Sequence, residues 1–447
     1  MFKKILIANR GEIALRIIRA CREMGIECVS VYSTADKDSI HTQLADKSIC
    51  IGPPQPGKSY LNIDNIITAA RITDCDAVHP GYGFLAENES FVRICQDNDL
   101  VFIGPPPEAI SLAGNKSKAV EVMKNARVPV IPGSNGNITD LKSAARLCRR
   151  LGYPVIIKAS FGGGGKGMRI CGSQDDLQQF YPMAKAESEK AFGTGDIYLE
   201  KYISRPRHIE FQIVADNFGR TICVGERECS IQRRHQKLIE EAPAVNLAPK
   251  LSKLMREYAI RAARAIDYRN LGTIEFLLDE DNNFYFIEIN TRIQVEHPIT
   301  EAVTGIDLVK EQILIAAGER IDLQRNHYRP RGHAIEFRIN AEDPGNGFTP
   351  CPGKITKSFI PGGPGVRVDT FIGTDSEVSP FYDSLLAKLI ISDKDRKSAI
   401  ARSARALDEF RIEGISTTID FHRKILSNRK FIDGDIHTHF IEEELKI

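Results

Sequence analysis

The sequence of 447 residues has almost no net charge, because 60 Lys and Arg residues oppose 59 Asp and Glu residues. The strongly basic field that would attract a chain to nucleic acid or acidic lipid is missing, so polyanion binding as the main role is disfavoured. No run of about 18 apolar residues occurs, as a membrane-spanning helix needs. Lys3 and Lys4 precede only Ile5 to Ala8 before polar residues return, which is too short for a signal peptide. These absences argue against a nucleic-acid-binding, membrane-bound or secreted protein.

The 10 cysteines are scattered singly, and no C-x-x-C pair occurs among them. This spacing argues against structural zinc or a disulfide frame and favours a reducing compartment, so we expect a cytoplasmic protein. A composition of 42% hydrophobic and 27% charged residues is that of a globular chain. At roughly 150 residues per domain, the length suggests about three domains.

Residues 1–112 show the alternation of a doubly wound α/β unit. Apolar residues recur at helical spacing from Ile13 to Met24, and Gly25 ends the predicted helix. The turn from His79 to Phe84 follows an expected strand and is rich in glycine and aromatic residues, which is typical of a ligand loop. An ordinary glycine-rich surface turn is the alternative. The strands that we expect are 5–8, 28–32, 77–79 and 101–103.

Residues 52–59 match G-x-x-x-x-G-K-S, the pattern of a phosphate-binding P-loop. That loop works because successive backbone N–H groups point at the phosphates. Prolines at 53, 54 and 56 remove three of those donors here. We therefore interpret the segment as a proline-stiffened connection.

A second glycine-rich run, FGGGGKG, occupies residues 161–167. We expect strands at 153–159 and 168–171 on either side of it, followed by a helix over 174–190. A dinucleotide fingerprint needs a helix directly after its glycines, so a Rossmann dinucleotide site is disfavoured. The run instead predicts a flexible hairpin whose N–H groups close over phosphates, with Lys158 and Lys166 adding positive charge. A surface hairpin without a ligand is the alternative.

Polar and apolar residues alternate from Glu288 to Glu296, so an extended backbone would place the polar side chains on one face. Upstream, strands are expected at 273–278 and 284–290 around a turn-rich segment. A hairpin centred between residues 281 and 282 places Glu275 directly opposite Glu288.

Two carboxylates facing each other at about 5 Å would repel, and a divalent cation resolves this. Glu275, Glu288 and Asn290 offer the hard oxygen ligands that Mg²⁺ prefers. The alternative is a half-buried strand with its polar side in water. A companion cluster at 208–237 is densely charged, and taken alone it predicts a solvated loop.

Four segments closely resemble biotin carboxylase: YPVIIKAS at 153–160 with the glycine run after it, ERECSIQRRHQKLIEEAP at 226–243, FIEINTRIQVEHPIT at 286–300 and RINAEDP at 338–344. The resemblance spans essentially the whole chain, from IANRGEIA at 7–14 to YDS at 382–384. It implies an ATP-grasp fold of the α/β class, with α+β character in the lid and the C-terminal part. The implied divisions are a Rossmann-like domain at 1–112, a connecting helix at 113–129, a mobile glycine-loop lid at 130–204, and the ATP-grasp catalytic and C-terminal domains at 205–447.

The resemblance also implies roles for individual residues. Lys116 and Lys158 would hold the phosphates of ATP, Gly164 and Gly165 would close over them, and His208, Gln232 and His235 would complete the nucleotide site. The hinge that reads adenine with its backbone would consist of Glu200, Lys201, Tyr202 and Ile203. Glu275, Glu288 and Asn290 match the ligands of Mg²⁺ or Mn²⁺, in agreement with the hairpin argument. The bicarbonate pocket would be Lys237, Arg292, Gln294 and the backbone of Val295.

In the implied mechanism, Glu296 deprotonates bicarbonate, which attacks the γ-phosphate of ATP to give carboxyphosphate. Carboxyphosphate yields CO2 and phosphate. The phosphate takes the ureido proton of biotin, and N1 of biotin then attacks CO2. Arg338 would stabilise the biotin enolate by electrostatic catalysis. Tyr82 and Phe84 would pack around the biotin ring.

The resemblance implies partners as well. We expect the biotin carboxyl carrier protein and the carboxyltransferase to be separate chains, because the faint carrier-like segment around Lys124 has helical spacing. Arg19 and Glu23 resemble positions at a homodimer interface, and an ordinary helix ion pair between them is the alternative. Phe161 stands where some family members have glycine, which leaves the final acceptor open among acetyl-CoA, pyruvate and others.

Two other functions must be weighed. Another ATP-grasp ligase would share the glycine loop and the metal acids but should lack the combination of 232–237 with 292–296. A non-catalytic nucleotide sensor predicts the loss of Glu296, Arg292 or Arg338, and all three are present.

Overall fold

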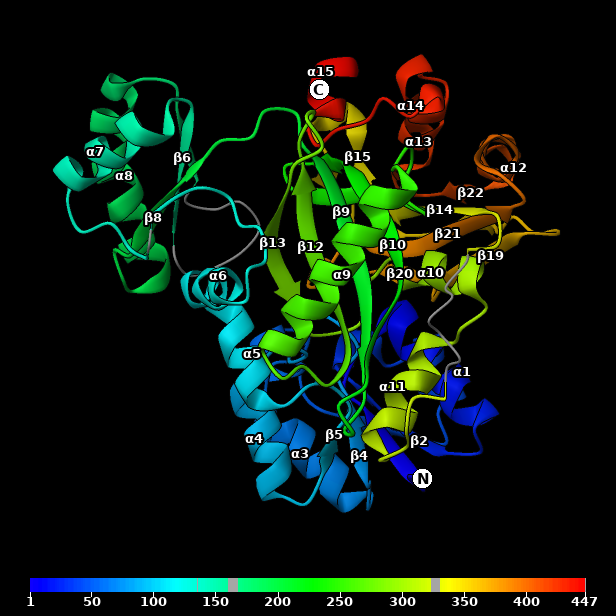
Figure 1. The fold of residues 1–447 in the computed structure, drawn as a ribbon. Helices are drawn as coiled ribbons and strands as arrows, with labels where there is room; N and C mark the ends of the chain where they lie inside the picture. The colour runs from blue at the N-terminus through cyan, green and yellow to red at the C-terminus, as the bar shows by residue number, and fades with distance from the viewer. Residues whose placement is uncertain (135, 160–167, 323–329, 447) are drawn as a thin grey trace.

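The structure, a computed structural model, describes residues 1–134, 136–159, 168–322 and 330–446. Its main sheets have five, three and eight strands. Figure 1 shows the five-stranded sheet with its helices at the bottom of the molecule and the eight-stranded sheet running upward from it. The three-stranded sheet stands apart at the upper left with α7 (Leu141–Leu151) and α8 (Gln174–Phe192) (Figure 1). This architecture is the α/β class expected from the sequence.

The N-terminal sheet is parallel with strand order β3-β2-β1-β4-β5, so the predicted doubly wound unit is confirmed. Ile7 of β1 pairs with His79 of β4, which brings the start of α1 beside the turn that follows His79. The strands are β1 (Lys4–Ile7), β2 (Glu27–Tyr32), β3 (Lys47–Cys50), β4 (Ala77–His79) and β5 (Val101–Phe102). The helices are α1 (Gly11–Glu23), α2 (Ile40–Leu44), α3 (Ile63–Ile72), α4 (Glu89–Asp97) and α5 (Pro107–Gly114).

The P-loop-like segment at 52–59 contains only a short 3-10 helix, Pro56–Lys58, on the way from β3 to α3. None of these residues lines the main cavity described below. Its interpretation as a connection agrees with the structure.

The three-stranded sheet has order β7-β6-β8, formed by β6 (Val155–Ala159), β7 (Arg169–Cys171) and β8 (Ile197–Lys201). The antiparallel pairing of β6 with β7 confirms that the glycine run joins two strands. The run itself, including Phe161, Gly164, Gly165 and Lys166, lies outside the described residues. The helical spacing around Lys124 is confirmed, because this residue lies in α6 (Lys116–Asn125). Met123 is buried in the core there, and Lys124 is half-buried.

The large sheet is antiparallel throughout, with order β13-β12-β9-β10-β11-β14-β21-β19. Its strands are β9 (Arg207–Ala215), β10 (Thr221–Arg233), β11 (Gln236–Ala242), β12 (Asn270–Leu278), β13 (Phe284–Asn290), β14 (His333–Asn340), β19 (Val366–Thr370) and β21 (Leu385–Asp393). Helices α9 (Pro249–Ala265), α10 (His297–Thr304) and α11 (Leu308–Ala316) pack on it or beside it. The densely charged segment 208–237 is therefore not a solvated loop: Glu210, Arg227 and Glu228 are buried in the middle of the sheet.

The predicted pairing of Glu275 with Glu288 in the hairpin is confirmed. A register shift next to Glu275 gives β13 one additional residue toward the turn. The predicted extended ladder to Glu296 is wrong, since β13 ends at Asn290 and residues 291–296 turn into α10. The physical reason is Ile293, whose side chain is fully buried in the core and holds the turn in place.

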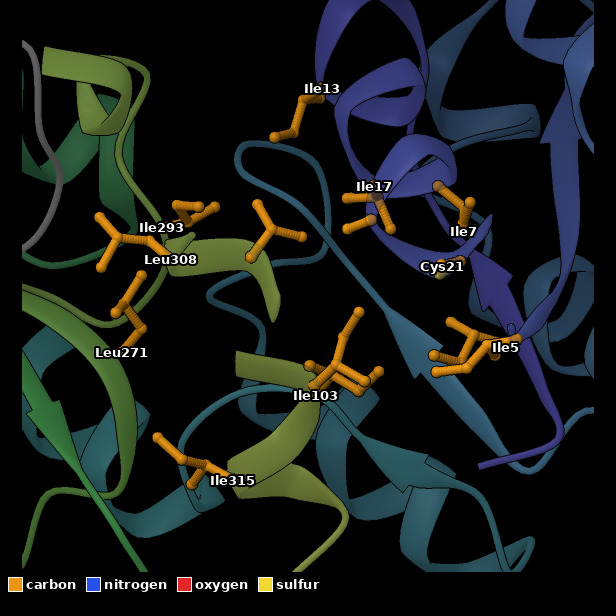
Figure 2. Packing of buried hydrophobic residues seen from close by; sticks show 14 of the residues in the cluster. Ile5, Ile7, Ile13, Ile17, Cys21, Ile103, Leu271, Ile293, Leu308 and Ile315 are labelled. Carbon is orange, nitrogen blue, oxygen red and sulfur yellow. The ribbon is translucent and has the colours of Figure 1, made fainter. Parts of the chain in front are cut away.

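That core cluster joins the N-terminal sheet to the large sheet. Figure 2 shows Ile13 and Ile17 of α1 together with Ile293 and Leu308 in one apolar cluster. The start of α1 and the segment 291–296 are consequently held in a fixed relation to each other. No helix in the described part of the chain is long and apolar enough to cross a bilayer.

The remaining elements form the C-terminal part, which extends from the top centre of Figure 1, where α15 lies, to the upper right. Its helices are α12 (Arg396–Glu409), α13 (Ile419–Leu426), α14 (Arg429–Asp433) and α15 (Phe440–Glu444). Three small sheets pair β15 (Glu342–Asp343) with β16 (Thr349–Pro350), β17 (Gly353–Lys354) with β20 (Glu377–Val378), and β18 (Lys357–Phe359) with β22 (Arg411–Glu413).

Candidate active site

A cavity of about 700 Å³ lies where the three main sheets meet. Of the site residues that the sequence predicts and the structure describes, all line this cavity except Glu200 and Glu296. Those two lie directly behind its wall, because Glu200 contacts Lys158 and Glu296 contacts both Lys237 and Arg338. Residues predicted from distant parts of the sequence thus converge on one site.

Lys237, from β11, is at the centre of the cavity floor. Its ammonium donates to Glu210 Oε2 at 2.6 Å, Glu296 Oε1 at 2.7 Å and Glu275 Oε1 at 3.1 Å. Burial alone would lower the pKa of Lys237, but the three carboxylates outweigh it and raise the pKa well above its usual value. Among the described residues three groups of side chains have ligand-like spacing, and two of them lie around Lys237: His208 with Glu210 and Glu275, and Glu210 with Cys229 and Glu296. The Lys237 ammonium already supplies a cation to both.

Glu296 is fully buried between two cations. Arg338 donates through one terminal nitrogen to Glu296 Oε2 at 3.0 Å, opposite the Lys237 contact, and through Nε to Glu240 Oε1 at 2.6 Å. Burial alone would raise the pKa of Glu296, yet Lys237 and Arg338 lower it below the usual range. Burial raises the pKa of Glu240 to about 7, because Arg338 compensates it less completely. Glu296 is therefore the ionised member and Glu240 the readily protonated one.

Arg227, on β10, has no exposed surface and forms an ion pair with Glu210, one of the carboxylates that contact Lys237. Its guanidinium contacts Glu210, donates to Gln212 Oε1 at 2.8 Å and donates to Thr300 Oγ1 of α10 at 2.9 Å. We call Glu210, Arg227, Lys237, Glu240, Glu296 and Arg338 the floor network. Each charge in it contacts at least one opposite charge.

The expected metal ligands lie at one side of the floor. Glu275 and Glu288 face each other across the β12–β13 pair, and Asn290 Nδ2 lies 2.7 Å from Glu275 Oε1. Lys237 and His208 outweigh the effect of burial and lower the pKa of Glu275 to about 2, so this carboxylate is ionised. Two carboxylates and an amide oxygen are a hard donor set, which fits Mg²⁺.

Lys116 and Lys158 lie at the rim of the cavity, and we call them the rim lysines. Lys116, at the start of α6, contacts Glu288 Oε2 at 3.1 Å, and Lys158, on β6, contacts Glu200 Oε2 at 2.6 Å. Their side chains retain 28% and 19% of their exposure, so each ammonium can still reach a ligand in the cavity.

The predicted hinge begins at the end of β8. Lys201 donates to the carbonyl oxygens of Gly152 and Tyr153, each at 3.1 Å, and the Tyr202 hydroxyl lies 3.1 Å from His439 Nε2. Together with Ile203, both residues line the cavity. His439 also lines it, and no motif in the sequence pointed to this residue.

The far end of the cavity is aromatic. Phe84 stacks on Tyr60 with ring centroids 4.9 Å apart, whereas the Tyr82 hydroxyl donates to Glu12 at the start of α1. Glu12 stands in the quoted segment 7–14, but its contact with a residue 70 positions away could not be read there.

Arg292 is held by residues that sequence reasoning missed. Its Nε donates to Glu87 Oε2 at 2.9 Å, and one terminal nitrogen donates to Gln294 Oε1 at 2.8 Å. Glu87 also accepts from the backbone N–H of Thr291 at 2.9 Å. No motif marks Glu87, and Arg227 stands in the quoted segment 226–243 without an assigned role. Both act through contacts between separate elements.

Glu23 contacts Lys310 Nζ of α11 at 2.6 Å. Among the described residues, Glu23 therefore pairs with Lys310 and not with Arg19, the helix partner that the sequence left open.

Three family models match consecutive parts of the chain. "Biotin carboxylase, N-terminal domain" covers residues 1–110, "Carbamoyl-phosphate synthase L chain, ATP binding domain" covers 115–324, and "Biotin carboxylase C-terminal domain" covers 336–443.

Individual relatives match over nearly the full length. A biotin carboxylase from Nostoc sp. is 55% identical over 442 residues, covering 99% of both chains. One subunit of the pyruvate carboxylase from Methanothermobacter thermautotrophicus is 52% identical over 443 residues, covering 99% of this chain and 90% of the relative. Among solved structures, the biotin carboxylase domain dimer of the Hydrogenobacter thermophilus 2-oxoglutarate carboxylase, in complex with MgADP, ADP and bicarbonate, matches with a TM-score of 0.95. That chain is 47% identical, and the match covers 100% of this chain and 98% of the other.

Proposed function

The chain belongs to the biotin carboxylase family, and we propose that its cavity carries out the ATP- and bicarbonate-dependent carboxylation of biotin on a separate carrier protein. The protein is an ATP-dependent ligase with an ATP-grasp fold. The observation that carries the proposed chemistry is Glu296, an ionised and buried carboxylate between Lys237 and Arg338, directly behind the cavity wall.

ATP would occupy the side of the cavity that the rim lysines and the hinge border. Lys116 and Lys158 would neutralise phosphate charge, and Lys201, Tyr202 and Ile203 would meet the adenine with His208, Gln232 and His235 nearby. Charge neutralisation and alignment are the main demands of phosphoryl transfer. Gly164 and Gly165 remain proposed contacts on family grounds.

Glu275, Glu288 and Asn290 would hold Mg²⁺, since they provide a hard oxygen set beside the rim lysines. The ion would supply charge neutralisation for the phosphates. The chain's own residues would orient the other substrate: Lys237, Arg292, Gln294 and the Val295 backbone would bind bicarbonate.

Glu296 would remove the proton from bicarbonate so that its oxygen can attack the γ-phosphate, giving carboxyphosphate. A base of lowered pKa is ionised at neutral pH, and Lys237 and Arg338 hold its two oxygens in place. Arg338 would then stabilise the negative charge that develops on the ureido oxygen of biotin, with Tyr82 and Phe84 around the ring.

We also propose the partners and divisions that the family suggests. The carboxyltransferase would be a separate chain, the protein would form a homodimer through the face that carries Arg19 and Glu23, and the domain limits would fall near 112, 130 and 204. The unpaired state of all cysteines supports a reducing compartment such as the cytoplasm. The relatives include subunits of carboxylases for different acceptors, so acetyl-CoA, pyruvate and 2-oxoglutarate all remain candidates.

The decisive experiment measures ADP release from Mg-ATP with bicarbonate and free biotin, each added or omitted. We expect cleavage to require bicarbonate and to increase when biotin is present. Cleavage stimulated by ammonia or an amino acid instead would contradict the proposal and favour another ATP-grasp ligase.

A further inference from the structure

Lys388 is a lysine with no exposed surface, in the middle of β21. It pairs across the sheet with Arg338 on one side and Asp369 on the other. Directly paired residues of an antiparallel sheet share a face, so Lys388 stands beside Arg338 on the face that α10 covers. None of the roles proposed above uses Lys388.

The Lys388 ammonium has two polar contacts that point in different directions. It donates to the carbonyl oxygen of Val295 at 3.0 Å, and it forms an ion pair with Glu12 Oε2 at 3.0 Å. The other oxygen of Glu12 accepts from the Tyr82 hydroxyl. Four residues from four separate elements thus form one continuous chain of polar contacts: Tyr82, Glu12, Lys388 and Val295.

The two ends of this chain lie at different substrates of the proposed reaction. Tyr82 borders the aromatic end of the cavity, where biotin would bind, and Val295 belongs to the segment that would bind bicarbonate. A fully buried ion pair is weak evidence for a purely stabilising role, because removing two charges from water costs about as much as their attraction returns. Apolar side chains of similar size could fill this space.

We propose that Lys388 and Glu12 are positioning residues that couple the biotin turn to the bicarbonate segment. This inference rests on the proposed function. A ligand that fixes Tyr82 holds Glu12, which holds Lys388 and so the Val295 carbonyl oxygen. Because coupling between two binding sites is reciprocal, bicarbonate must favour biotin binding by the same factor.

The first test uses two substitutions on the same turn. Tyr82→Phe removes the hydroxyl that contacts Glu12 and keeps the ring, whereas Phe84→Leu changes a ring whose aromatic contacts are with Tyr60 and Tyr382. We expect Tyr82→Phe to raise the KM for bicarbonate about fivefold, as loss of one hydrogen bond does. Phe84→Leu should raise the KM for biotin and leave that for bicarbonate unchanged within about twofold.

The second test removes the link itself. We expect Lys388→Met combined with Glu12→Gln to raise the KM for both bicarbonate and biotin about tenfold while the KM for ATP stays within about twofold. Adding Tyr82→Phe to this pair should raise the KM for bicarbonate no further, because the contact chain is already broken. Equal increases in all three KM values would indicate a merely structural role and overturn the inference.

If the double variant does not fold, the comparison of Tyr82→Phe with Phe84→Leu decides the question. An unchanged KM for bicarbonate in Tyr82→Phe, with the wild type active, overturns the inference and leaves the proposed function standing. A wild type that shows no bicarbonate-dependent cleavage overturns the proposed function, and the inference falls with it.

Discussion

The floor network and the rim lysines surround the same cavity but differ in how their charges are satisfied. In the floor network the charges are buried and interlocked, and Lys237 alone contacts three carboxylates. Each rim lysine is partly exposed and has one carboxylate partner. A preorganised group stabilises charge without rearranging during the reaction, whereas a half-exposed one remains available to bind a ligand. The floor network is therefore suited to the chemical step, and the rim lysines are suited to ligand binding.

Arg227→Met tests the floor most severely. Removing the guanidinium leaves the Glu210 carboxylate with less compensation in a fully buried position, so we expect the free energy of unfolding to fall by about 3–5 kcal/mol. Arg264→Met, on the exposed side of α9, should change it by less than about 0.5 kcal/mol. Denaturant unfolding measures both. Equal effects would mean that the interlocking of the floor contributes nothing to stability.

Glu296→Gln tests the chemistry of the floor. The amide keeps the shape of the side chain but cannot accept a proton, so we expect turnover to fall about 10²- to 10³-fold while ATP still binds. Bicarbonate-dependent ADP release and titration with a non-hydrolysable ATP analogue give the two readings. Glu280→Gln, in the exposed turn between β12 and β13, is the matched control. Unchanged turnover in Glu296→Gln would remove Glu296 as the base.

Lys116→Met tests the rim. Loss of a charged contact to phosphate should raise the KM for ATP about 10- to 100-fold. Because the pair with Glu288 is partly exposed, the free energy of unfolding should change by less than about 1 kcal/mol. Lys118→Met, an exposed position on the same helix, should change neither value. Strong destabilisation by Lys116→Met would show that floor and rim are not distinct.

The pH dependence of the free energy of unfolding is expected to be a gradual effect, small for each pH unit. Folding raises the pKa of Glu240 from the usual 4.5 to about 7, chiefly through burial, so the folded state keeps a proton that the unfolded chain releases. The resulting destabilisation is absent below pH 4.5 and grows as the pH rises to 7. Glu240→Gln should therefore gain stability relative to the wild type across this window, by at most about 1.4 kcal/mol per pH unit.

Unfolding in denaturant across pH 5 to 7 measures this difference, with Glu257→Gln on the exposed side of α9 as the control for losing one carboxylate. A difference that does not change with pH would show that Glu240 titrates like an exposed acid.

Local patterns were sufficient for much of the fold. The alternation and turn composition around 279–283 predicted that Glu275 faces Glu288, because the pairing of a hairpin follows from its own turn. Beyond Asn290 the alternation predicted an extended backbone, which is wrong. There, burial of Ile293 in a core shared with α1 turns the chain out of the strand. The charges at 226–228 looked solvated because their partners, among them Glu210 and Thr300, come from other elements.

By itself, the sequence determined the N-terminal α/β unit, the hairpin that pairs Glu275 with Glu288, the residue types of the site and the family that they resemble, since these depend on spacing along the chain. Only the tertiary structure decided which charges neutralise one another. Arg292 meets Glu87 across 205 positions of the sequence, and Lys388 meets Val295 across 93. Such contacts arise when separate elements pack together, and packing fixes the burial that decides which carboxylate is ionised and which holds a proton.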